Sequence, residues 1–337
     1  MERKYLVYGI LGAAAVIVLA VIAVGMIPPQ EPAVTPVYIV YGSEKGDLSY
    51  TDSAYLGLQQ AQHDLPITTR EFVPLDYQSL PGILSNTTGS DRPGLIITVG
   101  FQYSGFTQDL ARRYPAIRFL AIDQSGIGSE NLRSYEITSY GDSYLAGVLA
   151  ASATKNGRVG IIMGMQSDVL DTFFDGYADG ARAINSSIVI DRAYVHRNSV
   201  DGFADPEEAG RIAEGMYVNG TDVIFACAGY SNMGVFDAAR DHTGRYVIGT
   251  DSDQSPFGPD FVLASAMKRV DRVVFTGIRE LRDGSFTGGN RTAGLREGVT
   301  GIVYNPKFAF YNETVSAWEG KAEEEEAAYL ASRARPV

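Results

Sequence analysis

The sequence predicts an α/β protein built from parallel β-sheets that are covered by helices on both faces. Short apolar runs alternate with amphipathic helical stretches along almost the whole chain, the pattern of buried parallel strands joined by helices. With 337 residues, the chain is long enough for two domains of about 150 residues each. Two segments, one in each half, also share the same order of features, which indicates two lobes of like construction.

The expected elements follow from the apolar runs and from the helical periodicity between them. Strands are predicted at 37–42, 67–72, 95–100, 118–123, 159–164, 187–194, 222–229, 246–251 and 261–267. Helices are expected to begin near residues 52, 77, 104, 140, 169, 205, 232 and 270.

The two similar segments end at Asp123 and at Asp251. "LIITVGFQYSGFTQDLARRYPAIRFLAID" and "VIFACAGYSNMGVFDAARDHTGRYVIGTD" each contain an apolar strand, a Gly, Tyr-Ser, a helix carrying Ala-Arg, a second strand and a final Asp. Two lobes of one design would produce this echo. The alternative is that any two strand–helix–strand units look alike at this level.

Functional side chains are expected in the loops that follow the strands, because ligands of such sheets bind beyond the carboxyl ends of the strands. These loops lie at 46–52, 100–104, 123–126, 165–171, 229–232 and 251–254. They are rich in carboxylates, which can accept hydrogen bonds from adjacent ligand hydroxyls, and in aromatic rings, which can stack on a flat base. On these grounds sugar, nucleoside and amino-acid ligands all fit a cleft between two lobes.

The sequence carries no signature of an enzyme, a cofactor or a metal site. It has no phosphate loop, no dinucleotide-binding fingerprint and no nucleophile elbow. His63, His196 and His242 have no metal-ligand spacing, and the lone Cys227 lies in an apolar run where it is expected to be a small buried side chain. The net charge of −12, without a basic patch, also argues against nucleic acid as a partner. We therefore expect a binding protein.

The N-terminus predicts a membrane anchor. Arg3 and Lys4 precede the uncharged run 5–27, which is long enough to cross a bilayer. The positive-inside rule leaves residues 1–4 in the cytoplasm and the rest of the chain outside the cell membrane, with 28–36 as an extended linker.

Two further features of the sequence, a possible cleavage site and glycosylation sequons, bear on export of the protein. Cleavage after Ala23 or Gly25 is the alternative to an uncleaved anchor, since small residues stand at the right spacing. Glycosylation is expected because N-x-S/T sequons occur at Asn86, Asn185, Asn219, Asn290 and Asn312.

A series of short stretches within about residues 37–305 is similar, in order, to one known family. The stretches are "GDLSYTDSAYLGL" (46–58), "GDSYLAGVLAA" (141–151), "VGIIMGMQSDVLDTFFDGYADG" (159–180), "DVIFACAG" (222–229), "YVIGTDSDQ" (246–254) and "SAMKRVD" (265–271). Together they resemble the basic membrane protein family of extracytoplasmic binding proteins, whose known members bind purine nucleosides for ABC-type import.

The resemblance implies the type I periplasmic-binding-protein fold, with two Rossmann-like lobes of parallel sheet joined by a three-crossover hinge. It places lobe one at 37–150 plus 268–295 and lobe two at 155–267 plus 296–318. Residues 319–337 are then expected to form an acidic C-terminal helix and a tail, with the run of glutamates in solvent.

The resemblance also implies the ligand-binding residues. Tyr50 stands where a family Phe stacks on the base, and Phe225 stands where the second ring stacks. Asp251 would hold the ribose hydroxyls with the support of Lys268, and Gly229 would offer a backbone contact.

Further ligand contacts are expected beside these positions. Asp123 stands where a family carboxylate contacts the ligand. The other expected ligand-binding residues are Asp47, Thr51, Tyr103, Phe173 and Tyr230.

Structural alternatives exist for the main assignments. Phe225 could belong to the core, Lys268 could be a solvated hinge charge, Tyr50 a surface loop tyrosine, and Asp251 a helix cap. Ser49, with Asp52 three residues later, also has the pattern of a capping box.

The sequence departs from the family pattern at three positions. Tyr41 stands where an Asp is frequent, Thr51 where Asn is usual, and Tyr230 where a second Gly is common. The bulk of Tyr41 and Tyr230 would change the pocket near the ligand.

The resulting hypothesis is a membrane-tethered solute-binding protein that closes on a nucleoside, expected to be a purine nucleoside, and delivers it to ABC permease subunits. One alternative is a ligand-sensing ectodomain for a membrane receptor, and another is a protein that binds a sugar. A nucleoside hydrolase is a third, and it would need a metal-binding cluster of acids.

Overall fold

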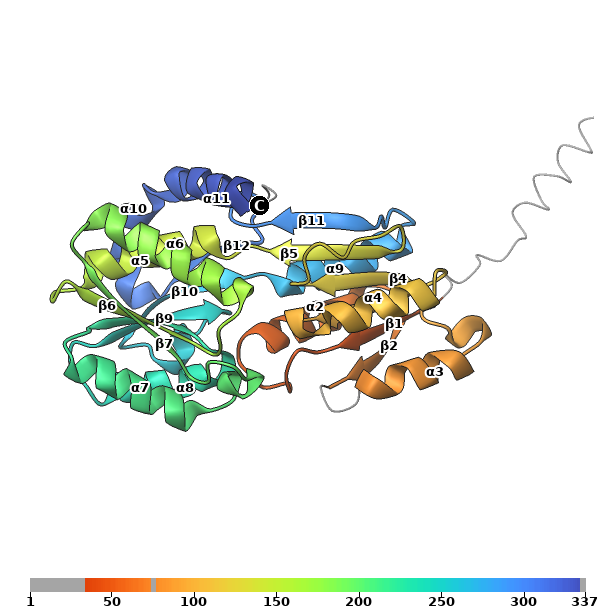
Figure 1. Ribbon diagram of the computed structural model, residues 1–337, viewed down its shortest axis with the longest axis horizontal. Coiled ribbons are helices and arrows are strands. Elements are labelled where there is room, and N and C mark those ends of the chain that lie inside the picture. Colours follow the sequence, from red (N-terminus) through yellow and green to blue (C-terminus); the bar gives the residue numbers. More distant parts are fainter. Residues whose placement is uncertain (1–33, 74–76, 334–337) are drawn as a thin grey trace, which may run out of the picture.

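The computed structural model describes residues 34–73 and 77–333, which form two α/β halves side by side (Figure 1). The predicted cytoplasmic end and membrane anchor lie outside the described residues. Within the described part of the chain, no helix is long and apolar enough to span a membrane. The first strand begins at Thr35, so the last residues of the predicted linker belong to the fold.

The first half contains a six-stranded sheet in the order β11-β5-β4-β3-β1-β2. All neighbouring strands of this sheet are parallel. Its strands are β1 (Thr35–Val40), β2 (Ile67–Phe72), β3 (Leu95–Val99), β4 (Arg118–Ile122), β5 (Leu132–Ile137) and β11 (Gly289–Ala293).

The second half contains a six-stranded sheet in the order β12-β10-β9-β8-β6-β7. Its strands are parallel except for β12, which is antiparallel to β10. They are β6 (Arg158–Met163), β7 (Val189–Tyr194), β8 (Val223–Cys227), β9 (Tyr246–Asp251), β10 (Val262–Lys268) and β12 (Thr300–Tyr304).

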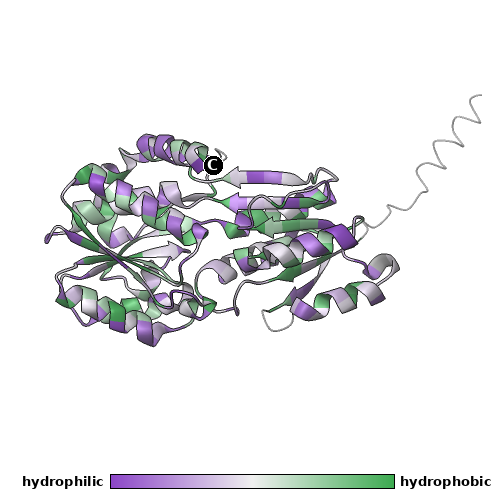
Figure 2. Ribbon diagram, in the orientation of Figure 1, coloured by the Kyte–Doolittle hydropathy of each residue, from purple (hydrophilic) through white to green (hydrophobic). Residues whose placement is uncertain are grey.

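Helices cover both faces of each sheet, and apolar residues concentrate in the strands between them (Figure 2). In the first half, α2 and α9 pack on one face and α3 and α4 on the other. In the second half, α5 and α6 pack on one face and α7 and α8 on the other. The helices are α2 (Tyr50–Asp64), α3 (Leu80–Asn86), α4 (Ser104–Arg113), α5 (Tyr140–Ala153), α6 (Asp168–Ile184), α7 (Pro206–Val218), α8 (Asn232–Arg240), α9 (Val270–Arg282), α10 (Asn312–Ser316) and α11 (Glu319–Arg333).

This architecture confirms the predicted fold class of two lobes with mainly parallel sheets. The echo ending at Asp123 and Asp251 is real in three dimensions: β3, α4 and β4 occupy the same order in their sheet as β8, α8 and β9 in theirs. Strands β5, β11 and β12 were not among the expected strands, because none of them is a continuous apolar run.

The chain passes between the two sheets three times, at 138–139, 268–269 and 294–299. We call these three crossovers the hinge. Helix α5, which the expected division assigns to lobe one, packs against α6 in the core of the second half. We therefore propose that lobe two begins at about residue 140.

Candidate functional site

The loop before α2 is organised by Asp47. Its two carboxylate oxygens accept hydrogen bonds from the Ser43 hydroxyl (3.1 Å) and from the backbone N–H groups of Ser49 (3.0 Å), Thr51 (2.8 Å) and Asp52 (3.0 Å). Unsatisfied N–H groups at a helix start attract such an acceptor. Asp47 therefore caps α2 and fixes the loop that enters it.

The expected capping box is wrong in its pairing. The Ser49 side chain makes no capping hydrogen bond, and Asp52 accepts bonds from the N–H groups of Gly46 (2.7 Å) and Leu48 (2.9 Å) instead. Because Asp47 satisfies the helix start, the Ser49 hydroxyl is free to bond across the cleft.

Left-handed backbone conformations cluster at this site. Among the described residues, the non-glycine residues with positive φ are Leu48 (55°), Asp123 (57°) and Asp251 (68°). Residues other than glycine rarely adopt this conformation, and those that do often lie at functional sites. Asp123 directly follows β4, and Asp251 is the last residue of the equivalent strand β9. The same left-handed conformation at each position directs both carboxylates into the space between the lobes.

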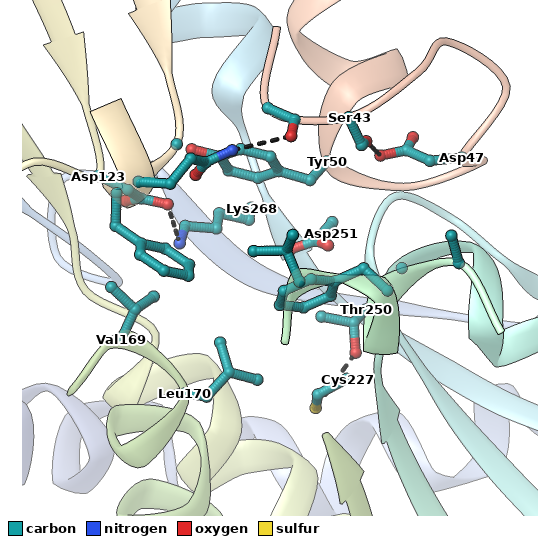
Figure 3. A pocket seen from close by; sticks show the side chains of 18 of the residues that line it. Ser43, Asp47, Tyr50, Asp123, Val169, Leu170, Cys227, Thr250, Asp251 and Lys268 are labelled. Carbon is teal, nitrogen blue, oxygen red and sulfur yellow. Dashed lines mark hydrogen bonds and ion pairs between the residues drawn. The ribbon is translucent and has the colours of Figure 1, made fainter. Parts of the chain in front are cut away.

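Lys268, the last residue of β10, forms a buried ion pair at the centre of the site. Its Nζ lies 2.6 Å from Asp123 Oδ2, and both side chains are almost fully buried (Figure 3). The same Nζ lies 5.4 Å from the ring centre of Tyr50 and 5.5 Å from that of Phe173. Burying two charges costs free energy unless they contact each other closely, and the 2.6 Å contact meets that condition.

Asp251 is the second buried carboxylate of the site. Ser49 Oγ donates a 2.6 Å hydrogen bond to its Oδ2. Burial raises the pKa of Asp251 to about 6, although the charge of Lys268 and the Ser49 bond act in the opposite direction. Among residues 34–73 and 77–333, no hydrogen bond to Oδ1 of Asp251 is found, so this oxygen is available to a ligand.

A cavity of about 430 Å³ opens between the two halves at the carboxyl ends of their strands (Figure 3). Its walls combine acidic and aromatic side chains with apolar ones. Residues of the first half that line it include Ser43, Glu44, Asp47, Tyr50, Phe101, Gln102 and Asp123. Residues of the second half and of the hinge include Val169, Leu170, Phe173, Val200, Phe203, Cys227, Gly229, Thr250, Asp251 and Lys268. The volume lies in the range of small-molecule sites.

Most, but not all, of the expected ligand-binding residues meet in this cavity. Those that line it are Asp47, Tyr50, Asp123, Phe173, Gly229, Asp251 and Lys268. Lys268 is not a solvated hinge charge, because it is buried in an ion pair. Tyr50 is not a surface loop tyrosine, because it forms part of the cavity wall.

The remaining expected residues lie elsewhere. Phe225 is fully buried in the core beside Phe173 and Tyr177, because a residue inside a strand points to the covering helices and not to the carboxyl end. Tyr103 is buried and donates a 2.7 Å hydrogen bond to the carbonyl oxygen of Tyr41.

Two more expected residues also lie outside the cavity lining. Thr51 is buried and bonded to Ser43 at 2.7 Å, whereas the Tyr230 side chain is 43% exposed. Tyr41 points away as well: its hydroxyl donates to Glu71 at 2.9 Å. The family departures at Tyr41 and Tyr230 are therefore outside the cavity.

Like Phe101, Phe203 is a cavity ring that the sequence prediction did not name. It ends the short helix η4 (Val200–Phe203), in the loop after β7. Its ring lies against the backbone at Gly164, where an added Cβ would lie 2.4 Å from it. The rule that ligands bind beyond strand ends applies to this loop too, and would have pointed to Phe203.

Cys227 was also missed as a cavity residue. Its side chain is only 5% exposed, as expected for a small apolar group, yet it lies on the cavity wall. The hydroxyl of Thr250 lies 3.4 Å from its Sγ, and burial raises the pKa of the thiol well above its usual range. It therefore stays a neutral, weakly polar part of the wall.

Two like-built α/β halves, joined by three crossovers and enclosing a polar and aromatic cavity at their strand ends, define a bilobal small-molecule-binding protein. A solute-binding protein of an ABC transporter system from Aeropyrum pernix K1 shares this structure with a TM-score of 0.73 and 27% identity. The match covers 85% of this chain and 80% of that one.

Sequence comparisons place the chain within one family of this class. Residues 35–328 match the family described as ABC transporter substrate-binding protein PnrA-like. The chain is 30% identical to basic membrane protein A1 of Borrelia garinii subsp. bavariensis, over 82% of each chain. It is 32% identical to the ABC transporter nucleoside-binding protein BmpA of Lactococcus lactis subsp. cremoris, over 72% of this chain and 73% of that one.

The chain therefore belongs to the basic membrane protein family, and it is an ABC transporter substrate-binding protein. This confirms the family resemblance seen in the sequence. The family is a class of binding proteins and not of enzymes, and it implies a small-molecule ligand and permease partners. An extracytoplasmic binding domain fits this family.

Proposed function

We propose that this protein captures a purine nucleoside between its two lobes and delivers it to an ABC permease. The observation that carries the proposal is the composition of the cavity. One part offers aromatic rings for a flat base, and another offers a buried carboxylate, Asp251, beside a lysine for adjacent hydroxyls. A nucleoside is the small molecule that joins these two chemistries.

The base is proposed to stack between Tyr50 and Phe203. The two rings come from opposite halves of the molecule and both line the cavity. Offset stacking on aromatic rings favours flat ligands, and a purine offers more stacking area than a pyrimidine. Phe203 thus takes the role that the family resemblance assigned to Phe225.

The ribose hydroxyls are proposed to bind Asp251. Its Oδ1 accepts no bond from the described residues, while its Oδ2 is held by Ser49. Lys268 is fixed by Asp123 at 2.6 Å and so presents a positive charge of defined position. Buried polar groups that stay unpaired cost free energy, so this cavity favours a ligand with matching hydroxyls.

The proposal includes the cellular context. Residues 5–27 would anchor the protein in the cell membrane, with the two lobes outside. Membership of the family supports delivery to the permease, and hinge closure would enclose the ligand.

A thermal-shift screen of the full-length protein tests this function. Purine nucleosides, uridine, sugars and amino acids are each added at equal concentration, and purine nucleosides are expected to raise the melting temperature most, as binding to the folded state requires. An equal shift by ribose would favour the sugar alternative. Chromatography of the same samples detects free base, and its appearance would favour a hydrolase.

A further inference from the structure

One glutamate of the C-terminal helix lies inside the protein, at the hinge. Glu326 belongs to the acidic run of α11, which was expected to face solvent, yet it is only 4% exposed. Its Oε1 accepts a hydrogen bond from the N–H of Gly141 (2.9 Å), and its Oε2 accepts one from the N–H of Leu295 (3.0 Å). Gly141 lies just after the first crossover and Leu295 lies within the third, so one carboxylate joins two crossovers.

The crossovers are themselves bonded side by side. The N–H of Thr138 donates to the carbonyl of Ala293 (2.9 Å), and the N–H of Arg269 donates to the carbonyl of Val299 (2.8 Å). The three crossovers therefore form one band with the third in the middle, and Glu326 adds a second link between the first crossover and the third.

Two glycines make room for this carboxylate. A Cβ added at Gly141 would lie 3.0 Å from Oε1 of Glu326, and one at Gly294 would lie 2.5 Å from Oε2. Side chains at either position would displace the carboxylate from the backbone amides. The sequence around both crossovers is thus fitted to Glu326.

Helix α11 is firmly attached to the second half of the molecule. The ring of Tyr329 stacks on Tyr140 of α5 with centres 4.5 Å apart and planes 25° apart. Its hydroxyl donates to Asp175 of α6 at 2.9 Å. Glu326 is therefore carried by the second half while it holds the crossover that leads from the first (Figure 1).

We propose that Glu326 is a positioning residue that limits how far the two lobes open and determines which crossover residues rotate when they do. We call this role the hinge clasp. With Leu295 held, rotation at the third crossover is restricted, and the lobes stay close to the arrangement in which Ser49 meets Asp251. The inference rests on the proposed function, because it assumes that closure of the lobes captures the ligand. Its test needs no ligand.

Hydrogen–deuterium exchange of the full-length, ligand-free protein tests the clasp. The variant Glu326→Gln replaces one acceptor oxygen with a donor that faces a backbone N–H. Exchange is expected to rise about tenfold in the hinge peptides 139–143 and 293–297. It should rise about as much in the lobe-contact peptides 46–53 and 250–255, because loss of a buried hydrogen bond raises the equilibrium constant for opening by roughly that factor.

Glu325→Gln is the matched control, since it makes the same charge change at a neighbouring, partly exposed position of α11, where Glu325 pairs with Lys321 at 2.7 Å. The exchange rates of all four peptides in this control are expected to equal those of the wild type. Faster exchange of the Glu326→Gln hinge peptides with unchanged lobe-contact peptides would overturn the proposal, because Glu326 would then be a local structural tie.

A milder variant covers the case in which Glu326→Gln loses protection throughout the protein. Tyr329→Phe removes only the hydroxyl bond to Asp175 and keeps the ring on Tyr140. It should raise exchange of the lobe-contact peptides in the same pattern, about two- to threefold. Unchanged lobe-contact exchange in this variant would equally refute the clasp. Failure of nucleosides to bind the wild type would refute the proposed function and leave this result standing.

Discussion

Ser49 Oγ lies 2.6 Å from Asp251 Oδ2, although the two residues are 202 positions apart and belong to different halves of the molecule. The contact is reinforced by the Ser252 hydroxyl, which donates to the carbonyl of Ser49 at 3.0 Å. The start of α2 thus touches the end of β9, beside the cavity. The same carboxylate is the one proposed to hold the ribose.

Removing the Ser49 hydroxyl is expected to weaken nucleoside binding. Ser49→Ala leaves a buried carboxylate oxygen without its donor, which costs on the order of 1–2 kcal/mol, or about a tenfold loss of affinity by calorimetry. Ser85→Ala, which removes an exposed hydroxyl on α3, should bind like the wild type. An unchanged affinity for Ser49→Ala would show that the contact does not support the ligand.

The ring of Tyr50, and not its hydroxyl, is expected to carry the stacking. Tyr50→Phe should keep affinity within about threefold, whereas Tyr50→Ala should lose about ten- to a hundredfold, as for loss of an aromatic stack. Tyr230→Ala is the matched control, because that exposed tyrosine lies outside the cavity lining. Equal losses for Tyr50→Ala and Tyr230→Ala would rule out the stacking role.

Asp251 is expected to make the ligand-free protein less stable at neutral pH than at mildly acidic pH. Its pKa is raised to about 6 in the fold, so its favourable contribution is complete below about pH 4 and is lost as pH rises through 6. Above pH 6, Asp251→Asn should therefore be more stable than the wild type by on the order of 3 kcal/mol, and its melting temperature should be higher. The two proteins should converge toward pH 4.

Asp241→Asn controls for the charge change, because Asp241 lies exposed at the end of α8. A stability difference for Asp251→Asn that does not vary with pH would contradict the assigned burial of this carboxylate.

The cavity is expected to reject nucleotides. The acidic residues Glu44, Asp47, Asp123, Asp201 and Asp251 line it, and Lys268 is already paired with Asp123. A phosphate would add like charge to this lining. Adenosine should bind at least about a hundredfold more tightly than AMP in calorimetry. Similar affinities would place the charged end of the ligand outside the acidic wall.

Much of the fold could be predicted because its strands are continuous apolar runs between amphipathic helices. Strand β5 was missed since it contains Arg133, whose burial depends on an ion pair with Glu280 of α9, a partner far along the chain. Strand β11 was missed because it is an edge strand with exposed polar residues. Both depend on tertiary contacts that no local pattern reveals.

The site was predictable where its residues follow strands, as Asp123 and Asp251 do. Phe225 was placed by family alignment alone, although its strand position directs it into the core. Phe203 lies in a polar loop after a weakly apolar strand. Glu326 gives no sequence signal, because its partners are backbone amides of distant crossovers.

Calorimetry of guanosine and of ribose against the same preparation of the full-length protein tests the central claim most directly. Stacking on Tyr50 and Phe203 together with hydroxyl binding at Asp251 predicts that guanosine binds at least about a hundredfold more tightly than ribose. Ribose binding as tightly as guanosine would contradict the account, since the base would then contribute nothing to recognition.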